Sequence, residues 1–347
     1  MHCTVDKLTD FATQALIKTG MSEKNARLSA IHLAHTDAAG IHSHGLKNLR
    51  GYIHKMQLGA MNPRGEAEVL REKGALALLD AHDALGTVGT TAAMDKAIAL
   101  GKEHGLALVT VKNSSHFGAP FLFPARAAEA GLIALLLTNT DPNTGVPDGR
   151  GRVIGNNPLC YALPWQGHHP VVLDISLSAT AAMKIIRAST RGEKLTGNVL
   201  YDLNGHYTDD PAWFFKGGAL APVGAHKGYG LSVLFEALTS VLSGGTPGFL
   251  VKSWLLALDT PNAITHTVIT IDPTALIGES AYAALDAYFE HILATPAAEG
   301  SQGVHLPGQR AFAKYDAALA HGLEMPEDVI SELQALASEL ALTFEAC

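Results

Sequence analysis

The segment GIHSHGL, residues 40–46, places Ser43 between two histidines at the expected end of a helix. A histidine changes its charge near neutral pH, so His44 could act as an acid or a base, and Ser43 could orient it or relay a proton. His42 and His44 could instead bind a metal ion, although a His-x-His pair does so best on a strand, where alternate residues share a face. Both histidines could also simply bond to carbonyl groups at the helix end. The segment alone leaves these three interpretations open.

Two further polar segments follow predicted strands. In NSSHFG, residues 113–118, His116 would face the crevice in which open α/β sheets bind ligands, and the serines and nearby backbone N–H groups could hold an anion. In TNTDP, residues 138–142, Asp141 could orient a histidine or bind a substrate hydroxyl. The alternatives are a pair of serines that caps the next helix and a plain Asp-Pro turn.

The segment GRGRVIGNNP, residues 149–158, comes close to a dinucleotide fingerprint but is rejected as one. Gly149, Gly151 and Gly155 approach the spacing Gly-x-Gly-x-x-Gly, and Asp174 follows at about the 20-residue distance that the fingerprint requires. The glycine spacing is one residue too long, however, and Pro158 precedes a predicted strand. The fingerprint needs a helix there, because the helix N-terminus holds the pyrophosphate.

The strongest phosphate site on physical grounds is GAHKGYGLSVLFEAL, residues 224–238. Its glycines let a ligand approach the backbone, the start of the helix exposes N–H donors, and Lys227 adds a positive charge. The segment DISLSAT, residues 174–180, leaves a predicted strand and ends in hydroxyl groups that could bind ribose or amide groups. The alternative for residues 224–238 is that the glycines only make the start of the helix flexible. The alternative for residues 174–180 is ordinary helix capping by the hydroxyl groups.

The elements that position these segments follow a helical, then an α/β, then a helical pattern. Apolar residues at helical spacing predict helices near the N-terminus, including one at 46–58. Strands predicted at 75–80, 106–112 and 132–139 alternate with helices, which indicates an α/β domain. Further strands are predicted at 159–163, 171–175 and 265–272, and a helix at 228–242. We expect an α/β domain of residues 75–299 and a helical domain of residues 1–74 plus 300–347, built from both chain ends.

Composition excludes several classes of protein. The 347 residues are 47% hydrophobic and 17% charged, which is typical of a globular chain, and 25 Lys and Arg against 33 Asp and Glu give a net charge of −8. With no long basic run, nucleic acid and anionic membranes are not expected as partners. The N-terminus lacks the apolar core of a signal peptide. Three scattered cysteines predict a reducing compartment without a disulfide framework. We therefore expect a cytoplasmic protein.

Taken together and in this order, eight segments resemble the malate/L-lactate dehydrogenase family. That family includes L-sulfolactate and ureidoglycolate dehydrogenases, diketogulonate reductase and piperideine-2-carboxylate reductase. The matching segments cover residues 37 to 310 and are DAAGIHSHGL, NSSHFG, TNTDP, GNNP, LDISLSAT, DLNGHYTDDP, HKGYGLS and LPGQR.

The resemblance implies a non-Rossmann α/β domain that binds NAD(H) or NADP(H), beside a helical domain, in a homodimer. It implies that His44 is the proton donor or acceptor, that Ser43 and Lys184 form a relay with it, and that His116 and Asp141 line the substrate pocket. The reductases of the family favour NADP(H) over NAD(H). The implied cofactor contacts are Asp174, Ile175, Ser176, Ser178, His226, Lys227, Gly228, Leu306, Gly308 and Arg310.

This chain departs from the family pattern near the expected substrate. Asn48 stands where the family usually has an arginine that grips the substrate carboxylate, and Arg50 follows two positions on. Asn156 replaces a threonine that often contacts substrate, and Met183 replaces a glycine before Lys184. The candidate substrate contacts are Asn48, Arg50, Tyr52, His54 and Asn156. A substrate without the usual carboxylate contact, or one held by Arg50, is consistent with these changes.

The function predicted from these features is hydride transfer between NAD(P)H and a small 2-oxo or 2-imino acid, in either direction, with His44 carrying the proton. Two alternatives remain open. One is a metal-dependent hydrolase that uses His42, His44 and His116. The other is a nucleotide-binding member of the family with weakened catalysis.

Overall fold

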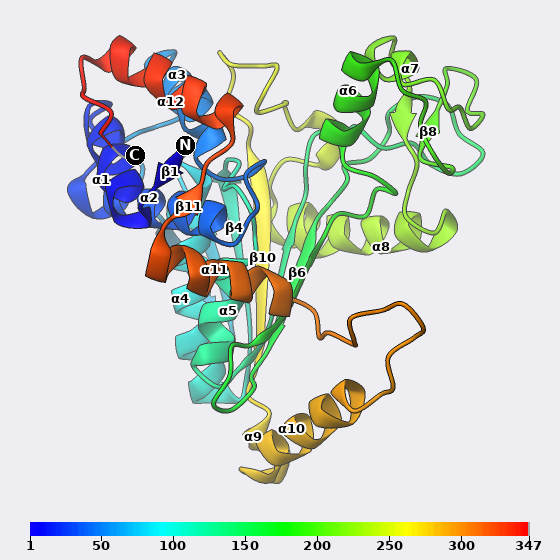
Figure 1. Ribbon diagram of the computed structural model, residues 1–347. Helices are drawn as coiled ribbons and strands as arrows, with labels where there is room; N and C mark the ends of the chain where they lie inside the picture. Colours follow the sequence, from blue (N-terminus) through cyan, green and yellow to red (C-terminus); the bar gives the residue numbers. More distant parts are fainter. Residues whose placement is uncertain (346–347) are drawn as a thin grey trace.

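A seven-stranded sheet forms the centre of the computed structural model, which describes residues 1–345 (Figure 1). In the described chain its strand order is β2-β3-β4-β10-β5-β6-β7. β3 and β4 are parallel, whereas β10 is inserted antiparallel between β4 and β5. The strands are β2 (Glu68–Lys73), β3 (Leu76–Asp80), β4 (Leu106–Ser114), β5 (Ile133–Thr138), β6 (Leu159–Leu163), β7 (Val171–Ile175) and β10 (Ile264–Ile271).

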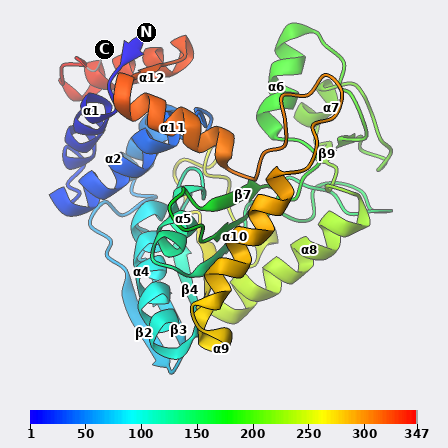
Figure 2. The same cartoon turned by 60° about the horizontal axis from the view of Figure 1, so that its bottom comes forward.

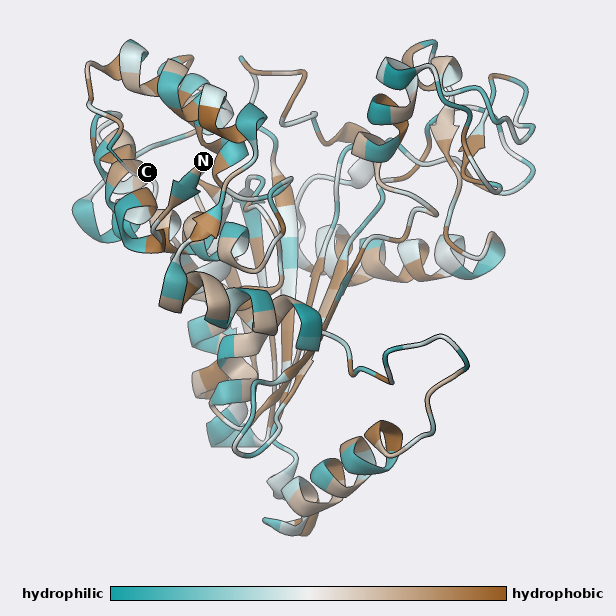
Figure 3. Cartoon of the chain, in the orientation of Figure 1, coloured by the Kyte–Doolittle hydropathy of each residue, from teal (hydrophilic) through white to brown (hydrophobic). Residues whose placement is uncertain are grey.

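Helices cover both faces of this sheet (Figure 2). On one face α4 (Gly86–His104) and α5 (Leu122–Glu129) pack on apolar side chains of β4 and β5. α4 lies so close to β10 that a Cβ at Gly101 would meet Thr270 Oγ1 at 2.4 Å, so this position requires glycine. On the other face α8 (His226–Glu236) continues as a π-helical turn at Ala237–Val241. Figure 3 shows the sheet strands mostly in brown and white, as expected for strands buried on both faces.

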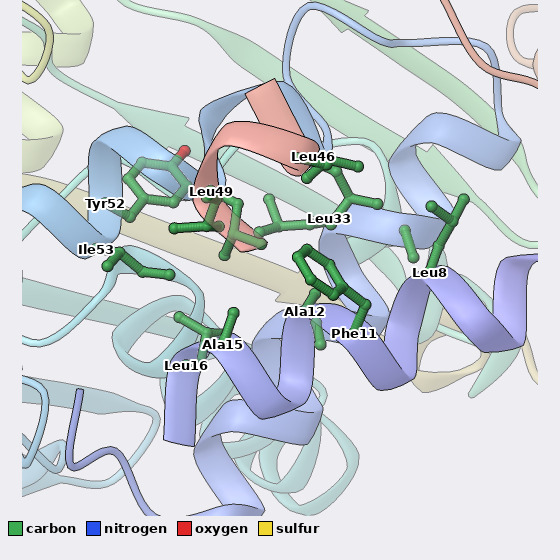
Figure 4. Packing of buried hydrophobic residues seen from close by; sticks show 14 of the residues in the cluster. Leu8, Phe11, Ala12, Ala15, Leu16, Leu33, Leu46, Leu49, Tyr52 and Ile53 are labelled. Carbon is green, nitrogen blue, oxygen red and sulfur yellow. The ribbon is translucent and has the colours of Figure 1, made fainter. Parts of the chain in front are cut away.

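The two ends of the chain pack together beside the sheet. α1 (Val5–Ile17), α2 (Glu23–Ala38) and α3 (Leu49–Gln57) share one hydrophobic core with α12 (Glu327–Leu340), and Figure 4 shows side chains of this core. β1 (His2–Cys3) pairs with β11 (Leu323–Glu324), and α11 (Gln309–His321) lies against α2. A short 3-10 helix, Leu46–Asn48, precedes α3, so the helix predicted at 46–58 is confirmed apart from its first turn.

A smaller lobe and an outlying helix complete the described chain (Figure 1). The lobe contains α6 (Ala182–Arg191), α7 (Ala212–Phe215) and the strand pair β8 (Leu200–Tyr201) and β9 (Ala219–Leu220). α9 (Thr274–Ile277) and α10 (Ser280–Leu293) follow β10, and α10 packs Phe289 against Val171 and Trp165. The sequence did not predict β2, whose six residues are all exposed and therefore show no apolar alternation.

Two further observations concern the cysteines and the helices. Cys160 is a buried free thiol, whereas Cys3 is disulfide-bonded, and the absence of a disulfide framework stays a prediction. Within the described residues no helix has the length and apolar character needed to cross a membrane.

Candidate active site

The loop that carries Ser43 and His44 is held at two points by one buried carboxylate. Asp37, on the last turn of α2, accepts a hydrogen bond from the backbone N–H of Leu46 at 2.7 Å through Oδ2, and its Oδ1 lies 2.8 Å from His42 Nδ1. A Cβ at Gly45 would lie 2.3 Å from Asp37 Oδ2, so glycine is needed for this approach. Burial raises the pKa of Asp37, and the bond to His42 partly opposes that rise.

Ser43 and His44 are in direct contact. The Ser43 hydroxyl lies 2.8 Å from His44 Nδ1, which fixes the ring and leaves Nε2 to face a reactant. Burial lowers the pKa of His44, so the neutral imidazole predominates at neutral pH. A neutral histidine oriented by a hydroxyl group is suited to accept a proton from an alcohol or an amine.

His116 lies next to His44, with ring centroids 5.9 Å apart. Its Nδ1 is 2.5 Å from the hydroxyl of the buried Tyr52, and its ring stacks on Trp254 at 4.4 Å between centroids. Burial, reinforced by His44 and His266, lowers the pKa of His116 well below its ordinary value. A Cβ at Gly118 would meet the backbone oxygen of His44 at 2.6 Å, so the two loops are in close contact. The structure therefore joins two segments that were only predicted to be neighbours.

Asp141 and Asn156 belong to a second group beside these histidines. Asn156 Oδ1 accepts a hydrogen bond from Thr140 Oγ1 at 2.9 Å. Burial raises the pKa of Asp141, while a hydrogen bond to Ser253 and the charge of Arg152 oppose the rise. Ser253 directly precedes the Trp254 that stacks on His116, so the two groups are linked by consecutive residues.

The predicted cofactor segments converge at the end of β7. Val172 N–H donates to Pro307 O at 3.0 Å, which places the Leu306–Arg310 turn against β7. Beyond the strand, Leu177 N–H donates to Asn156 O at 2.7 Å, and Val223 N–H donates to Leu177 O at 2.8 Å. Asp174, Ile175, Ser176 and Ser178 thus lie between the 306–310 turn and the turn that leads into α8. Burial raises the pKa of Asp174 to about 7.

The start of α8 suits a phosphate group. Gly224 and Ala225 have φ of +57° and +53°, which turns the chain sharply into the helix. A Cβ at Gly228 would meet Val223 O at 2.5 Å, whereas a Cβ at Gly230 would meet no atom within 4 Å. His226 and Lys227 are exposed, and no side chain caps this end of the helix. The exposed N–H groups at this helix start and the positive charge of Lys227 could hold a phosphate group.

Several predicted substrate residues form ion pairs or hydrogen bonds with other residues of the protein. Arg50 was predicted at the substrate, and in the structure its guanidinium group pairs with Glu332 at 3.0 Å and with Glu339 at 2.5 Å, both on α12. His54 likewise pairs with Glu339 at 2.9 Å. These carboxylates hold both side chains on the α12 side of α3, away from His116.

Asn48 and Lys184 also differ from expectation. Asn48 is buried, donates to Ser43 O at 3.2 Å and bonds to Tyr52, so its side chain supports the catalytic loop. Lys184 is exposed on α6 in the smaller lobe, and within the described residues its side chain contacts neither Ser43 nor His44. The three-membered relay is therefore not assembled within one described chain.

His42 and His44 do not share a face toward one ion. His42 Nδ1 is bound to Asp37, and His44 Nδ1 is bound to Ser43. Among the residues that the structure describes, no group of three or more histidine, cysteine or acidic side chains has the arrangement of a metal site.

Three residues at this site were not singled out from the sequence. They are Asp37, Ser253 and Trp254, and they contact His42, Asp141 and His116 respectively. Asp37 had a recognisable signal, since a carboxylate at a helix end beside a glycine-rich loop is suited to bind backbone N–H groups. Trp254 lies in an irregular segment with no motif around it.

Known proteins resemble this chain over almost its whole length. A family model described as malate/L-lactate dehydrogenase matches residues 3–334. The malate dehydrogenase of Pyrococcus horikoshii is 28% identical over 345 residues, which is 97% of this chain and 95% of that protein. The (2R)-3-sulfolactate dehydrogenase (NADP(+)) of Chromohalobacter salexigens is 31% identical over 327 residues, or 94% of this chain and 95% of that one.

Solved structures agree with this assignment. Sulfolactate dehydrogenase from Methanocaldococcus jannaschii has a TM-score of 0.92 and 27% identity, covering 99% of each chain. The delta1-piperideine-2-carboxylate reductase from Pseudomonas syringae has a TM-score of 0.87 and 27% identity, covering 97% of this chain and all of that one, 100%. The predicted family and the predicted non-Rossmann α/β fold are thus confirmed. The chain belongs to the malate/L-lactate dehydrogenase family, a family of nicotinamide-dependent oxidoreductases.

Proposed function

We propose that this protein transfers a hydride between NAD(P)H and a small 2-oxo or 2-imino acid, with His44 as the proton donor or acceptor. The observation that carries the proposal is the Ser43–His44 pair at 2.8 Å, held in place by Asp37 and adjacent to His116. Relatives named as malate, sulfolactate and ureidoglycolate dehydrogenases and a neighbour named as piperideine-2-carboxylate reductase support the substrate class.

The roles of the side chains follow from their protonation. The nicotinamide, when bound, supplies or takes up the hydride at the substrate carbon. In the oxidative direction neutral His44 accepts the proton of the substrate hydroxyl or amine at Nε2 while Ser43 holds Nδ1. In the reductive direction protonated His44 returns that proton to the same oxygen or nitrogen. Neutral His116, bound to Tyr52, would hydrogen-bond the substrate beside it.

The cofactor segments would bind the dinucleotide along the edge formed by β7 and α8. Lys227 and the start of α8 would hold phosphate, and Asp174, Ser176 and Ser178 would hold ribose or amide groups. A positive group near the 2′-phosphate would favour NADP(H) over NAD(H), and our slight preference for NADP(H) rests on the reductases of the family alone. Fluorescence titrations with NADPH and NADH decide between the two, and Lys227→Ala is expected to weaken both.

We also propose a homodimer in the cytoplasm. Exposed apolar side chains on and after α8 support a partner surface, since Val241, Phe249 and Leu256 are 72%, 68% and 80% exposed. Light scattering on the purified protein should give twice the mass of the chain. A monomer at micromolar concentration would contradict the proposed homodimer but not the proposed hydride transfer.

The test of the function is a screen by absorbance of the reduced nicotinamide. The protein is mixed with NADPH or NADH and with pyruvate, oxaloacetate, 2-oxoglutarate, sulfopyruvate, diketogulonate, or pyruvate plus methylamine to form an imine. Oxidation of either cofactor with one of these acids supports the proposal. Cofactor binding without turnover on any acid would indicate a nucleotide-binding protein with weakened catalysis, and no cofactor binding at all would overturn the proposal.

A further inference from the structure

An irregular segment, residues 251–262, runs from the 3-10 helix Gly248–Leu250 to β10 and is fastened to the helical part of the chain by one lysine. Lys55, on α3, is 0% exposed, and its Nζ donates to Ala257 O at 2.7 Å and to Thr260 O at 2.8 Å. Asn262 Nδ2 closes the segment by donating to Lys252 O at 2.8 Å. Because burying an ammonium group is costly unless it is hydrogen-bonded, these bonds define one preferred position for the segment.

This segment places two consecutive side chains, Ser253 and Trp254, at the candidate active site. Trp254 stacks on His116 with an interplanar angle of 11°, and its ring centroid lies 5.6 Å from that of Tyr52. Ser253 hydrogen-bonds Asp141. A Cβ at Gly51 would lie 3.6 Å from Trp254 Cζ3, an ordinary van der Waals distance, so the indole also lies beside α3.

The two rings that Trp254 contacts, those of Tyr52 and His116, are uncharged at neutral pH. Tyr52 is fully buried and neutral, and His116 has its pKa held low by burial. Arg50, the cation predicted to hold an anionic substrate group, is paired with Glu332 and Glu339. The indole itself is only half-buried, so it keeps apolar surface beside the histidines. Such a surface attracts apolar groups and gives no compensation for the desolvation of a second anion.

We infer that Trp254 is a specificity-determining residue, which forms an apolar wall for the substrate side chain, and that Lys55 is the positioning residue that holds this wall in place. The inference rests on the proposed function and makes the substrate class narrower. The preferred substrates are 2-oxo or 2-imino acids with an uncharged, apolar side chain, rather than acids with a second carboxylate or a sulfonate.

The experiment compares kcat/KM for three probes with NADPH or NADH: 2-oxobutyrate, which has an apolar side chain, oxaloacetate, which has a second carboxylate, and glyoxylate, which has no side chain. The variants are Trp254→Ala, Trp254→Phe, Lys55→Met and Lys55→Arg. The matched control is Leu256→Ser, which alters an 80% exposed residue of the same segment.

The wild type is expected to prefer 2-oxobutyrate over oxaloacetate. Trp254→Ala is expected to lower kcat/KM for 2-oxobutyrate about 10-fold, the scale on which a hydrophobic pocket discriminates, and to leave glyoxylate little changed. Lys55→Met should also lower kcat/KM for 2-oxobutyrate, by raising KM. Lys55→Arg keeps two hydrogen-bond donors, so its kcat/KM for 2-oxobutyrate should be close to that of the wild type. Trp254→Phe should fall between wild type and Trp254→Ala.

Four results would overturn the inference. An equal fall for all three probes in Trp254→Ala would show a merely structural role, and an unchanged ratio would show that the indole does not contact the side chain. A wild type that prefers oxaloacetate would refute the substrate class while leaving the proposed function intact. No turnover of any probe, or of any acid in the screen above, would remove the proposed function and this inference together.

Discussion

The Ser43 hydroxyl and His44 Nδ1 lie 2.8 Å apart, so the serine decides which nitrogen of the imidazole is left for chemistry. When Nδ1 donates to the hydroxyl, Nε2 is a base, and when the ring is protonated, Nε2 is an acid. The direction of the reaction therefore depends on the protonation of this one residue, and pH should act on the two directions in opposite ways.

The first prediction concerns that pH dependence. Burial lowers the pKa of His44, so the base form should already be populated below pH 6.5, the ordinary value for histidine. The kcat/KM for oxidation should rise with pH and reach half its maximum below pH 6.5, whereas the kcat/KM for reduction should fall over the same range. A half-maximum for oxidation above pH 7 would show that a different group controls the reaction.

The second prediction concerns Asp37. Asp37→Ala leaves the buried Leu46 N–H without its partner, which costs about 1–3 kcal/mol of unfolding free energy, and it also removes the partner of the partly exposed His42. Asp37→Asn keeps an acceptor for Leu46 and should lose less. Urea denaturation gives the stability, and kcat should fall further in the alanine variant than in the asparagine variant. An alanine variant with normal kcat would show that the catalytic loop does not depend on Asp37.

The third prediction concerns stability and Asp174. Burial raises its pKa to about 7 in the folded protein, above the ordinary 3.8 of an unfolded chain. A raised pKa means that the stabilising contribution is complete below pH 3.8 and is lost as the pH rises through 7. Without cofactor, the unfolding free energy of Asp174→Asn relative to the wild type should increase between pH 5 and pH 8, because only the wild type loses this contribution. Asp6→Asn, the same change at an exposed site, should not, and equal slopes in all three proteins would contradict the prediction.

The fourth prediction concerns Arg50. Because its guanidinium group is committed to Glu332 and Glu339, Arg50→Ala should leave kcat/KM for the substrate unchanged. The loss of partly exposed ion pairs should cost about 1 kcal/mol or less of unfolding free energy. If KM instead rises strongly while the stability stays constant, Arg50 binds substrate and the contact with α12 is secondary.

The local sequence pattern was sufficient to predict most of the strands and helices that position the site. The strands at 106–112 and 132–139 and the glycine–lysine start of α8 were predicted because the apolar period and the turn residues reflect contacts over short distances in the sequence. The family resemblance supplied His44, His116 and Asp174 as site residues in one step.

Long-range contacts account for what the sequence did not reveal. Arg50 was expected at the substrate because it follows Asn48 by two positions, and nothing local indicated its partners Glu332 and Glu339, which lie 282 and 289 residues away. Lys55 looks like an ordinary surface residue of a helix, yet the 251–262 segment covers it. Trp254 meets His116 by stacking between distant loops, and no spacing rule predicts such a contact.

The central claim is that His44 carries the proton, and the most direct measurement is the kcat of His44→Ala beside its Kd for NADPH and NADH. We predict that kcat falls by about 10²-fold or more, the usual contribution of an acid–base group, while the Kd of the cofactor stays at the wild-type value. A variant that keeps full kcat would contradict the account and assign the proton to another residue.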